Sequence, residues 1–380
     1  MKRRFKFPHS QMKSAMAKPL GTAGPSFTLV LFFLYLSCCF HFHIGECNRP
    51  KRKAALFIFG DSLLDVGNNN YINTTTLDQA NFWPYGETYF KFPTGRFSDG
   101  RLISDFIAEY AKLPLLPPFL QPGSQQNYYN GANFASAGAG ALVSTFQGSV
   151  IDMETQLKNF KKVETWWRKK LRKSKSQNML SNAVYLFSIG TNDYLSLFVT
   201  NSSVQVSPQY EQMVVSNLTA IVKEIYKIGG RKFGFLNLGD LGCVPGLRIL
   251  NSSSKNGCLE KASNLAKLHN VELYNILLKM KKQLKGFKYS LYDFNSSLRE
   301  RIDHPSKYGL KEGKIACCGT GQFRGIHSCG GKRPVGHEFE LCQNPSMHVF
   351  WDSYHLTEII YQQMAAQMWN GPSSFKSLFQ

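Results

Sequence analysis

Short apolar segments alternate along the chain with amphipathic stretches, and this alternation limits its fold more than any other feature. Apolar residues recur at helical spacing over 102–111, 153–171, 208–228 and 259–284. Six short segments rich in β-branched and aromatic residues lie around and between them: 55–59, 132–135, 183–189, 233–238, 288–293 and 349–351. Strands that alternate with helices in this way favour a parallel sheet with helices packed on both faces.

The chain is long enough to bury a large core, and no linker divides it. It has 380 residues, of which 43% are hydrophobic and 18% are charged, as in ordinary globular proteins. After residue 47 there is no internal repeat and no stretch rich in Gly, Ser or Pro that would act as a linker. We therefore predict one domain over residues 47–380.

Residues 1–46 have the composition of a targeting segment. Six Lys and Arg residues and no acid occur within residues 1–18, and a nearly continuous apolar run follows over 27–44. This order is that of a secretory signal peptide, and it predicts a secreted, extracellular protein. No clear cleavage signal is present, and Met12 or Met16 would give a signal of more usual length. An uncleaved membrane anchor is the alternative.

The cysteines fit an oxidising compartment. Six of them form an even set, and Cys243 and Cys258 bracket a short polar loop that a disulfide would close. The pairing of the other four stays open. The alternative is a zinc site, although the spacing matches no zinc finger or ribbon. That site would be formed by Cys317, Cys318, Cys329 and Cys342 with His327 or His337.

Five Asn-x-Ser/Thr sequences are candidate N-glycosylation sites, and they also fit secretion. They begin at Asn73, Asn201, Asn217, Asn251 and Asn295. Asn344 is followed by Pro345 and is not counted.

The chain carries a formal net charge of +20, and its densest basic run covers residues 158–175. A solvated helix face is the simpler interpretation of this run, with Trp166 and Trp167 partly packed. Attraction to an acidic surface, such as polyanionic wall polysaccharide or anionic lipid, is the alternative. Nucleic acid is a poor partner for a secreted chain.

Candidate catalytic residues follow the predicted strands, where parallel sheets place their functional groups. Ser62 comes two residues after Gly60 at the end of the first strand, and its hydroxyl is a candidate nucleophile. Asp352 and His355 are three residues apart, so the carboxylate can orient the imidazole as a base for Ser62. In isolation, these groups also fit an ordinary helix cap and a surface ion pair.

A serine that attacks an acyl carbonyl also needs hydrogen-bond donors for the oxyanion that forms. Gly131 can bring a backbone N–H close to a substrate because it lacks a side chain, and Asn192 can offer an uncharged amide N–H. A turn glycine and an Asx turn are the structural alternatives.

Four blocks of sequence resemble, in order, those of the plant GDSL esterase/lipase family in the SGNH hydrolase superfamily. They are GDS at 60–62, NGANFASAGAG at 130–140, GTNDY at 190–194 and DSYHLTE at 352–358. The resemblance implies a flavodoxin-like, three-layer α/β/α sandwich with a parallel sheet of about five strands. It also implies Ser62 as nucleophile and oxyanion donor, Gly131 and Asn192 as the other donors, His355 as base and Asp352 as its orienter.

The same resemblance implies a secreted serine hydrolase of the apoplast or cell wall that cleaves carboxylic esters through an acyl-enzyme on Ser62. It implies an acyl-ester small molecule or lipid as substrate, with no metal, no cofactor and no obligate protein partner. The chain is similar to the branch of extracellular lipases linked to plant defence. An acyltransferase and a catalytically silent extracellular binding protein are the alternatives. Phe82-Trp83 and Phe119-Leu120 are candidates to line an acyl groove, for which core packing is the alternative.

Overall fold

The computed structural model describes seven ranges of the chain. These are residues 54–75, 78–123, 127–200, 208–251, 257–329, 339–372 and 374–380, and they fall in one compact unit, Lys53–Gln380. The predicted targeting segment, residues 1–46, and the candidate glycosylation site Asn201 lie outside the described residues. Within the described ranges, none of the helices is both long and apolar enough to span a bilayer.

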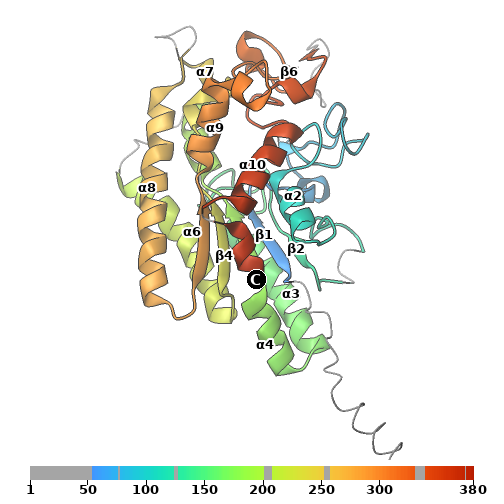
Figure 1. Ribbon diagram of the computed structural model, residues 1–380, viewed down its shortest axis with the longest axis vertical. Helices are drawn as coiled ribbons and strands as arrows, with labels where there is room; N and C mark the ends of the chain where they lie inside the picture. The colour runs from blue at the N-terminus through green and yellow to red at the C-terminus, as the bar shows by residue number, and fades with distance from the viewer. Residues whose placement is uncertain are drawn as a thin grey trace, which may run out of the picture. The chain divides into compact units, whose positions relative to one another are not determined.

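A five-stranded parallel sheet forms the centre of this unit (Figure 1). Its strands are β1 (Leu56–Gly60), β2 (Gly131–Asn133), β3 (Val184–Ser188), β4 (Lys232–Leu236) and β5 (Lys288–Tyr292). They are hydrogen-bonded in the order β2-β1-β3-β4-β5, and every neighbouring pair is parallel. This is the flavodoxin-like order, so the predicted fold class is confirmed.

Helices cover both faces of the sheet, which gives this unit three layers (Figure 1). One face is covered by α3 (Met153–Lys170), α6 (Pro208–Ile228) and α8 (Glu260–Gln283). The other face is covered by α2 (Ile103–Tyr110), α9 (Phe294–Asp303) and α10 (Glu358–Asn370). Shorter helices occupy the connections, namely α4 (Lys173–Asn182), α5 (Thr191–Val199) and α7 (Pro245–Arg248). The helices predicted from periodicity are α2, α3, α6 and α8.

Aromatic residues of neighbouring strands stack on the face of the sheet that packs against α3. The rings of Phe57 and Tyr185 lie 5.6 Å apart, and those of Phe59 and Phe187 lie 4.9 Å apart. Trp167 of α3 packs on Phe57 at 5.3 Å between ring centroids. Because all residues of β1 and β3 are buried, the strand that leads to Ser62 is tightly packed along its whole length.

One predicted strand, residues 349–351, does not join the central sheet. Phe350 instead forms an isolated antiparallel bridge with Leu356, and the N–H of Trp351 donates to the His355 carbonyl at 2.8 Å. The apolar pattern of this segment reflects a buried position and not a strand, because Val349, Phe350 and Trp351 all lie in the core. The segment therefore folds back on itself and presents the loop that carries His355.

Six cysteines form three disulfides in the described part of the chain. The pairs are Cys243–Cys258, Cys317–Cys342 and Cys318–Cys329. The first closes the loop predicted from the sequence. The other two brace a small antiparallel pair, β6 (Cys318–Gly319) and β7 (Glu340–Leu341). Because a disulfide sulfur is no longer a thiolate ligand, the zinc alternative at these four cysteines is wrong.

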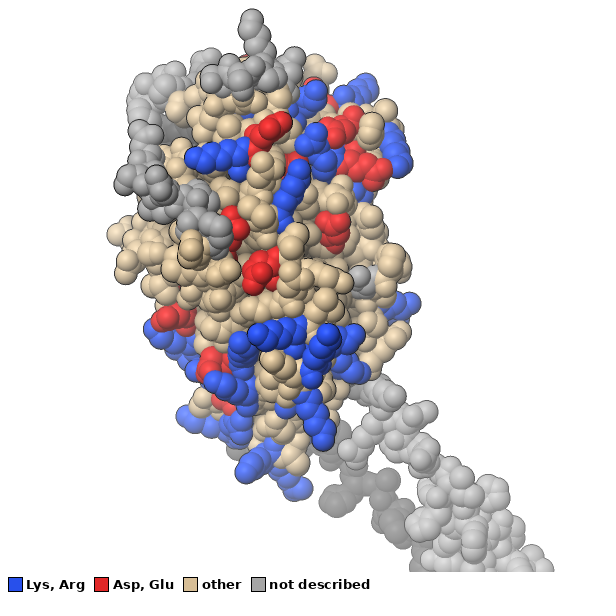
Figure 2. All heavy atoms as spheres, turned by 90° about the vertical axis from the view of Figure 1, so that its left-hand side faces the viewer, with Lys and Arg blue, Asp and Glu red and all other residues tan. Residues whose placement is uncertain are grey.

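Exposed cations gather at the end of the molecule where the strands begin. The basic run 158–175 covers most of α3 and the start of α4, and its Lys and Arg side chains are exposed whereas Trp167 is buried. Figure 2 shows Lys and Arg side chains collected toward the lower end of the face formed by α6 and α8. Exposed lysines at the ends of α6 and α8 and at the start of β5 are Lys223, Lys227, Lys279, Lys281, Lys282, Lys285 and Lys288. This arrangement agrees with the simpler interpretation of the basic run, a solvated helix face.

Candidate active site

Ser62 lies in a turn that leaves β1 abruptly. At Gly60, β1 approaches β3 so closely that a Cβ atom would lie 2.3 Å from the carbonyl oxygen of Ser188. The N–H of Asp61 donates to that same oxygen at 3.2 Å, and the Asp61 carbonyl accepts from the N–H of Asp65 at 2.9 Å. The chain therefore turns directly after the strand, and Ser62 lines a pocket of about 680 Å³ at the carboxyl end of the sheet.

His355 connects Ser62 to a buried carboxylate. Its Nε2 atom lies 2.8 Å from the Ser62 hydroxyl oxygen, and its Nδ1 atom lies 2.8 Å from Oδ1 of Asp352. The ring packs against Phe97, with 4.7 Å between the ring centroids. A proton held on Nδ1 by the carboxylate leaves Nε2 free to accept the serine proton. The three residues predicted from the sequence are thus hydrogen-bonded in the order that nucleophilic catalysis requires.

The Asp352 carboxylate is held by donors from two directions. Its Oδ1 atom accepts from the backbone N–H groups of Tyr354 and His355 at 2.9 and 2.8 Å. Its Oδ2 atom accepts from the hydroxyl of Tyr85, a buried residue 267 positions away in sequence, at 2.7 Å. Burial acts to raise the pKa of Asp352, but His355 and these donors outweigh it and hold the pKa below its usual range. Sequence reasoning missed Tyr85, because no local pattern links it to Asp352.

Asn192 is placed where the predicted amide donor is needed. It lies in the first turn of α5, directly after β3, and lines the same pocket as Ser62. Its Nδ2 atom donates one hydrogen to the carbonyl of Ala139 at 2.9 Å, which orients the amide and leaves its second hydrogen for a substrate.

The prediction that Gly131 is an oxyanion donor is wrong. Gly131 pairs with Leu56 at the beginning of β1, whereas Ser62 follows the end of that strand. Leu56, which pairs with Gly131, lies four residues before the end of β1, and four residues of strand span about 13 Å. The N–H of Gly131 already donates to the carbonyl of Tyr128 at 3.1 Å. Its glycine character is explained by the close approach of β1, since a Cβ would lie 1.8 Å from the Leu56 oxygen.

Gly138 takes the place that sequence analysis gave to Gly131. It follows the carboxyl end of β2 by five residues, has φ +78°, and lines the pocket beside Ser62. Within the described ranges, no residue accepts a hydrogen bond from the N–H of Ser62 or of Gly138. These two N–H groups and Nδ2 of Asn192 form a candidate oxyanion hole. The signal was present in the sequence, since Gly138 lies in the same glycine-rich block but beyond the strand.

A family model described as GDSL-like lipase/acylhydrolase matches residues 56–368. The chain belongs to this family. It is 61% identical to GDSL esterase/lipase 5 of Arabidopsis thaliana over 332 residues, which cover 87% of this chain and 86% of the relative. It is 50% identical to GDSL esterase/lipase 2 of the same plant, over 91% of this chain and 95% of the relative.

Membership of the GDSL esterase/lipase family makes the protein a carboxylic ester hydrolase. The family also includes a relative named as an inactive GDSL esterase/lipase-like protein of Arabidopsis thaliana, 33% identical over 91% of this chain and 78% of the relative. The assembled Ser62, His355 and Asp352 therefore bear on activity more directly than overall similarity does.

In this GDSL hydrolase, Asp193 ties the two loops of the candidate oxyanion hole together. Its carboxylate accepts from the N–H groups of Ala141 and Leu142 at 2.7 and 3.0 Å and from the hydroxyl of Thr145 at 2.6 Å. Asp193 follows Asn192 in α5, and the three donors lie just beyond Gly138. The contacts therefore fix the position of one hole donor relative to the other.

Asp61, next to the nucleophile, is a buried carboxyl with few partners. Its Oδ1 atom accepts from the N–H of Leu63 at 3.1 Å, whereas its Oδ2 atom is buried without a hydrogen-bond partner among the described residues. Burial raises the pKa of Asp61 to about 7, and the Leu63 N–H opposes this shift. The folded protein thus holds a proton on Asp61 at a pH where the unfolded chain has released it.

We expect the fold to become less stable as the pH rises, because the buried Asp61 carboxyl must then lose its proton. The unfolded carboxyl titrates near its ordinary pKa of 3.8 and the folded one near 7, so the free energy of unfolding falls as the pH rises between these values. Asp61→Asn keeps the shape and cannot ionise, so it should remove most of a loss on the order of 3 kcal/mol. Thermal unfolding of both proteins from pH 5 to pH 8 measures this, with Glu154→Gln on the surface of α3 as the control. An unchanged pH dependence in Asp61→Asn would contradict the assignment.

The two pairs that the sequence suggested for an acyl groove, Phe82-Trp83 and Phe119-Leu120, lie in different environments. Phe82 lines the pocket, whereas its neighbour Trp83 is 60% exposed and does not. Phe119 is buried in the core, and Leu120 packs against it from the edge. Core packing therefore explains the second pair, and only Phe82 faces the substrate site.

The candidate glycosylation sites differ in accessibility. Asn73 and Asn217 are exposed. Asn251 and Asn295 are half-buried, and their side-chain amides donate to the carbonyls of Cys258 and Leu238 at 2.9 and 3.0 Å. The exposed Asn217 also donates its amide, to the Met213 carbonyl at 2.9 Å, so a glycan is accommodated most easily at Asn73.

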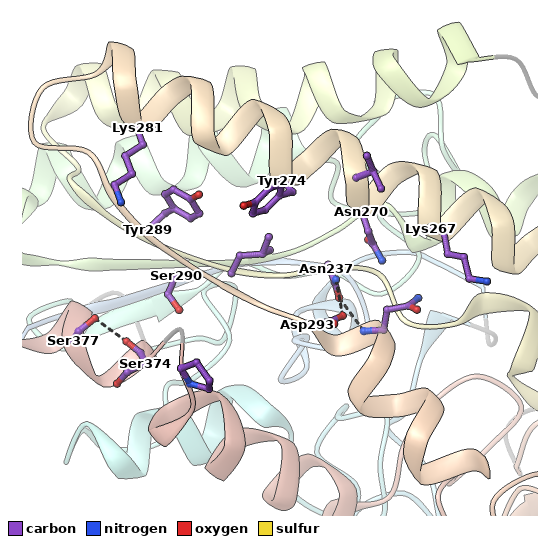
Figure 3. A pocket seen from close by; sticks show the side chains of 14 residues that line it. Asn237, Lys267, Asn270, Tyr274, Lys281, Tyr289, Ser290, Asp293, Ser374 and Ser377 are labelled. Atoms are coloured by element: carbon purple, nitrogen blue, oxygen red, sulfur yellow. Dashed lines mark hydrogen bonds between the residues drawn. The ribbon is translucent and has the colours of Figure 1, made fainter. Parts of the chain in front are cut away.

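A second hollow, of about 880 Å³, lies between α8, β5 and the C-terminal segment (Figure 3). Its amide side chains bond mainly to neighbouring protein groups. Asn237 donates to Asp293 at 3.0 Å, and the Asn270 amide bonds both the N–H and the carbonyl of Leu238. None of the described residues that line it is a histidine, so these residues do not form a serine–histidine pair like that of the Ser62 pocket. The Ser62 pocket is therefore the candidate for the ester-cleaving site.

Proposed function

We propose that this ester hydrolase works through an acyl-enzyme on Ser62, with His355 as general base and acid and Asp352 as the group that orients it. The observation that carries the proposal is the distance of 2.8 Å between His355 Nε2 and the Ser62 oxygen, with Nδ1 of the same ring on Asp352. Oxyanion stabilisation falls to the N–H groups of Ser62 and Gly138 and to Nδ2 of Asn192.

The reaction proceeds in two steps, acylation of Ser62 and hydrolysis of the acyl-enzyme. His355 accepts the hydroxyl proton as the oxygen of Ser62 bonds to the ester carbon, and it then gives that proton to the departing alcohol oxygen. Water replaces the alcohol in the second half: His355 takes a proton from it, the hydroxide bonds to the acyl carbon, and the proton returns to Ser62 as the carboxylic acid leaves. Asp352 stays ionised throughout and stabilises the imidazolium that forms twice in each cycle.

The test is hydrolysis of p-nitrophenyl esters from acetate to palmitate by the wild type and by Ser62→Ala. We expect the variant to lose activity on every ester by at least about 10³-fold, because the nucleophile is gone. Equal thermal unfolding temperatures would show that the loss is chemical. Undiminished hydrolysis by Ser62→Ala would reject the nucleophile, and an inactive wild type would favour transfer to another acceptor or a binding role.

We also propose that the chain is made with a targeting segment over residues 1–46, is secreted and works outside the cell as a single domain over 47–380. Support comes from the basic and apolar order of that segment, the three disulfides and the exposed sequons at Asn73 and Asn217. Mass analysis of protein recovered from culture medium tests both signal cleavage and glycans. A full-length, unmodified chain retained inside the cell would overturn the proposal. A role in plant defence rests on the resemblance of its branch alone.

The cationic end of the molecule is proposed to attract the protein to the acidic polysaccharide of a cell wall or to anionic lipid. The exposed lysines lie near the beginnings of β4 and β5, whereas Ser62 and Asn192 follow the ends of their strands. Binding at that end would therefore leave the pocket open. We expect retention on polygalacturonate at low salt and release at high salt. Equal elution from polygalacturonate and from an uncharged polysaccharide would count against it.

A further inference from the structure

The Ser62 pocket is apolar on one side. Because β1 lies between β2 and the pair β4 and β5, the loops that follow β4 and β5 lie on one side of Ser62 and the loop that follows β2 lies on the other. The side chains contributed to the pocket by the segments after β4 and β5 are Leu241, Val244, Leu247, Phe294 and Leu298. Such a wall suits the hydrocarbon part of an acyl group.

The β2 side of the pocket is more polar. The side chains of Thr75, Asp78, Gln79 and Ser149 line it, together with Phe82 and Phe146. Asn69 fixes this wall, since its Nδ2 atom donates to the carbonyls of Asp78 and Ala137 at 2.8 and 3.0 Å. The segment that carries Asp78 is therefore held against the loop that carries Gly138.

Asp78 presents one carboxylate oxygen without a partner. Its Oδ2 atom accepts from the hydroxyl of Thr75 at 2.8 Å, but no described residue donates a hydrogen bond to its Oδ1 atom. A Cβ atom on Gly138 would lie 2.8 Å from this Oδ1, so the oxygen sits directly beside the candidate oxyanion hole. Partial burial raises the pKa of the Asp78 carboxyl, because ionising a carboxyl that is less well solvated than in water costs free energy. A hydroxyl group of a bound substrate would remove that cost.

The charge of the pocket decides which alcohol fits. The chain is strongly basic, yet among the described residues that line this pocket there is no Lys or Arg, and the carboxylates of Asp78 and Asp352 are present. An alcohol that carries phosphate or carboxylate would lie beside the Asp78 carboxylate and would find no Lys or Arg among these described residues. A neutral alcohol with hydroxyl groups has donors for Oδ1 of Asp78 and is not repelled.

We propose that Asp78 selects esters of an apolar acid with a hydroxylated alcohol, by accepting a hydrogen bond from a hydroxyl group of the alcohol. The acyl chain lies along Leu241, Val244 and Phe294, and the alcohol lies toward Asp78. This inference rests on the proposed function and names the substrate class of the same site. Asp78 is thus a specificity residue, and it takes no part in the proton transfers.

The test compares two esters of one acid, glycerol 1-monooctanoate and propyl octanoate, which differ only in the two hydroxyl groups. We expect the wild type to favour the glycerol ester in kcat/KM by roughly tenfold or more. In Asp78→Ala this ratio should fall to about two or less. Asp78→Asn, which keeps an acceptor without the charge, should give an intermediate ratio. Since the readout is a ratio for one enzyme, partial unfolding of a variant cancels.

Three outcomes would overturn the inference alone. They are equal kcat/KM for the two esters in the wild type, a preference that persists in Asp78→Ala, and a strong preference for octanoylcholine that Asp78→Ala abolishes, which would make Asp78 a cation site. A wild type that hydrolyses neither these esters nor p-nitrophenyl octanoate would overturn the proposed function and this inference with it. Hydrolysis of p-nitrophenyl octanoate with no preference between the two alcohols separates the two failures.

Discussion

Replacing His355 by alanine is expected to lower kcat for ester hydrolysis by about four orders of magnitude and to leave the fold intact. Nε2 of the imidazole lies 2.8 Å from the Ser62 oxygen and can take its proton, so without it the hydroxyl stays a weak nucleophile. His355 lies in a loop after the buried segment Val349–Trp351, and its removal leaves that apolar segment unchanged. The measurement is the steady-state hydrolysis of p-nitrophenyl butyrate, with thermal unfolding as the check on folding.

His304→Ala is the matched control for this variant. His304 is an exposed residue that follows the end of α9 and lies outside the pocket, so its loss should leave kcat within about twofold of the wild type. Near-normal turnover by a folded His355→Ala would reject His355 as the base. It would mean that another group of the pocket activates Ser62.

Asn192→Ala should lower kcat by about 10²- to 10³-fold with a much smaller change in KM. The second N–H of its amide is available to the substrate, and it is needed most when negative charge develops on the carbonyl oxygen. Hydrolysis of p-nitrophenyl butyrate over a range of concentrations separates the two constants.

The variant Asn192→Asp tests whether the effect depends on the charge of the side chain. Aspartate has the same shape but places a carboxylate where the oxyanion forms, so its activity should fall below that of Asn192→Ala. An effect confined to KM, or an aspartate variant more active than the alanine variant, would show that Asn192 acts through loop structure alone. The contact between its amide and the Ala139 carbonyl is the structural role that such a result would favour.

Patterns within a few residues made Ser62, Asp352 and His355 candidates, and the order of the four sequence blocks gave them their expected roles. Gly60 and Ser62 are close in the chain, as are Asp352 and His355, so their relation depends on one turn of backbone. The parallel sheet was predictable for a similar reason, because the period of apolar residues reports which face of each element is buried. Helices α5, α9 and α10 were missed, since each begins directly at a functional loop whose polar residues hide the pattern.

The error at Gly131 shows where local reasoning stops. Residues 130–140 include three glycines, and the strand predicted over 132–135 has Gly131 before it and Gly138 after it, but its pairing with the first strand was not predicted. Strand β2 covers only Gly131–Asn133 and pairs with the first half of β1, so Gly131 lies at the wrong edge of the sheet and Gly138 at the right one. Register between strands is set by packing and hydrogen bonds across the sheet, which a single segment does not reveal.

The sequence by itself predicted the layered α/β architecture, named Ser62, Asp352 and His355 as candidate catalytic residues, and determined the basic character of the chain. Only the tertiary structure decided which glycine faces the substrate, how four of the cysteines pair, and that Tyr85 supports Asp352 from 267 residues away. It also placed the free oxygen of Asp78 beside Gly138. The physical reason is range: periodicity and turn chemistry act between neighbours in the chain, whereas these contacts arise only when the packed core brings distant segments together.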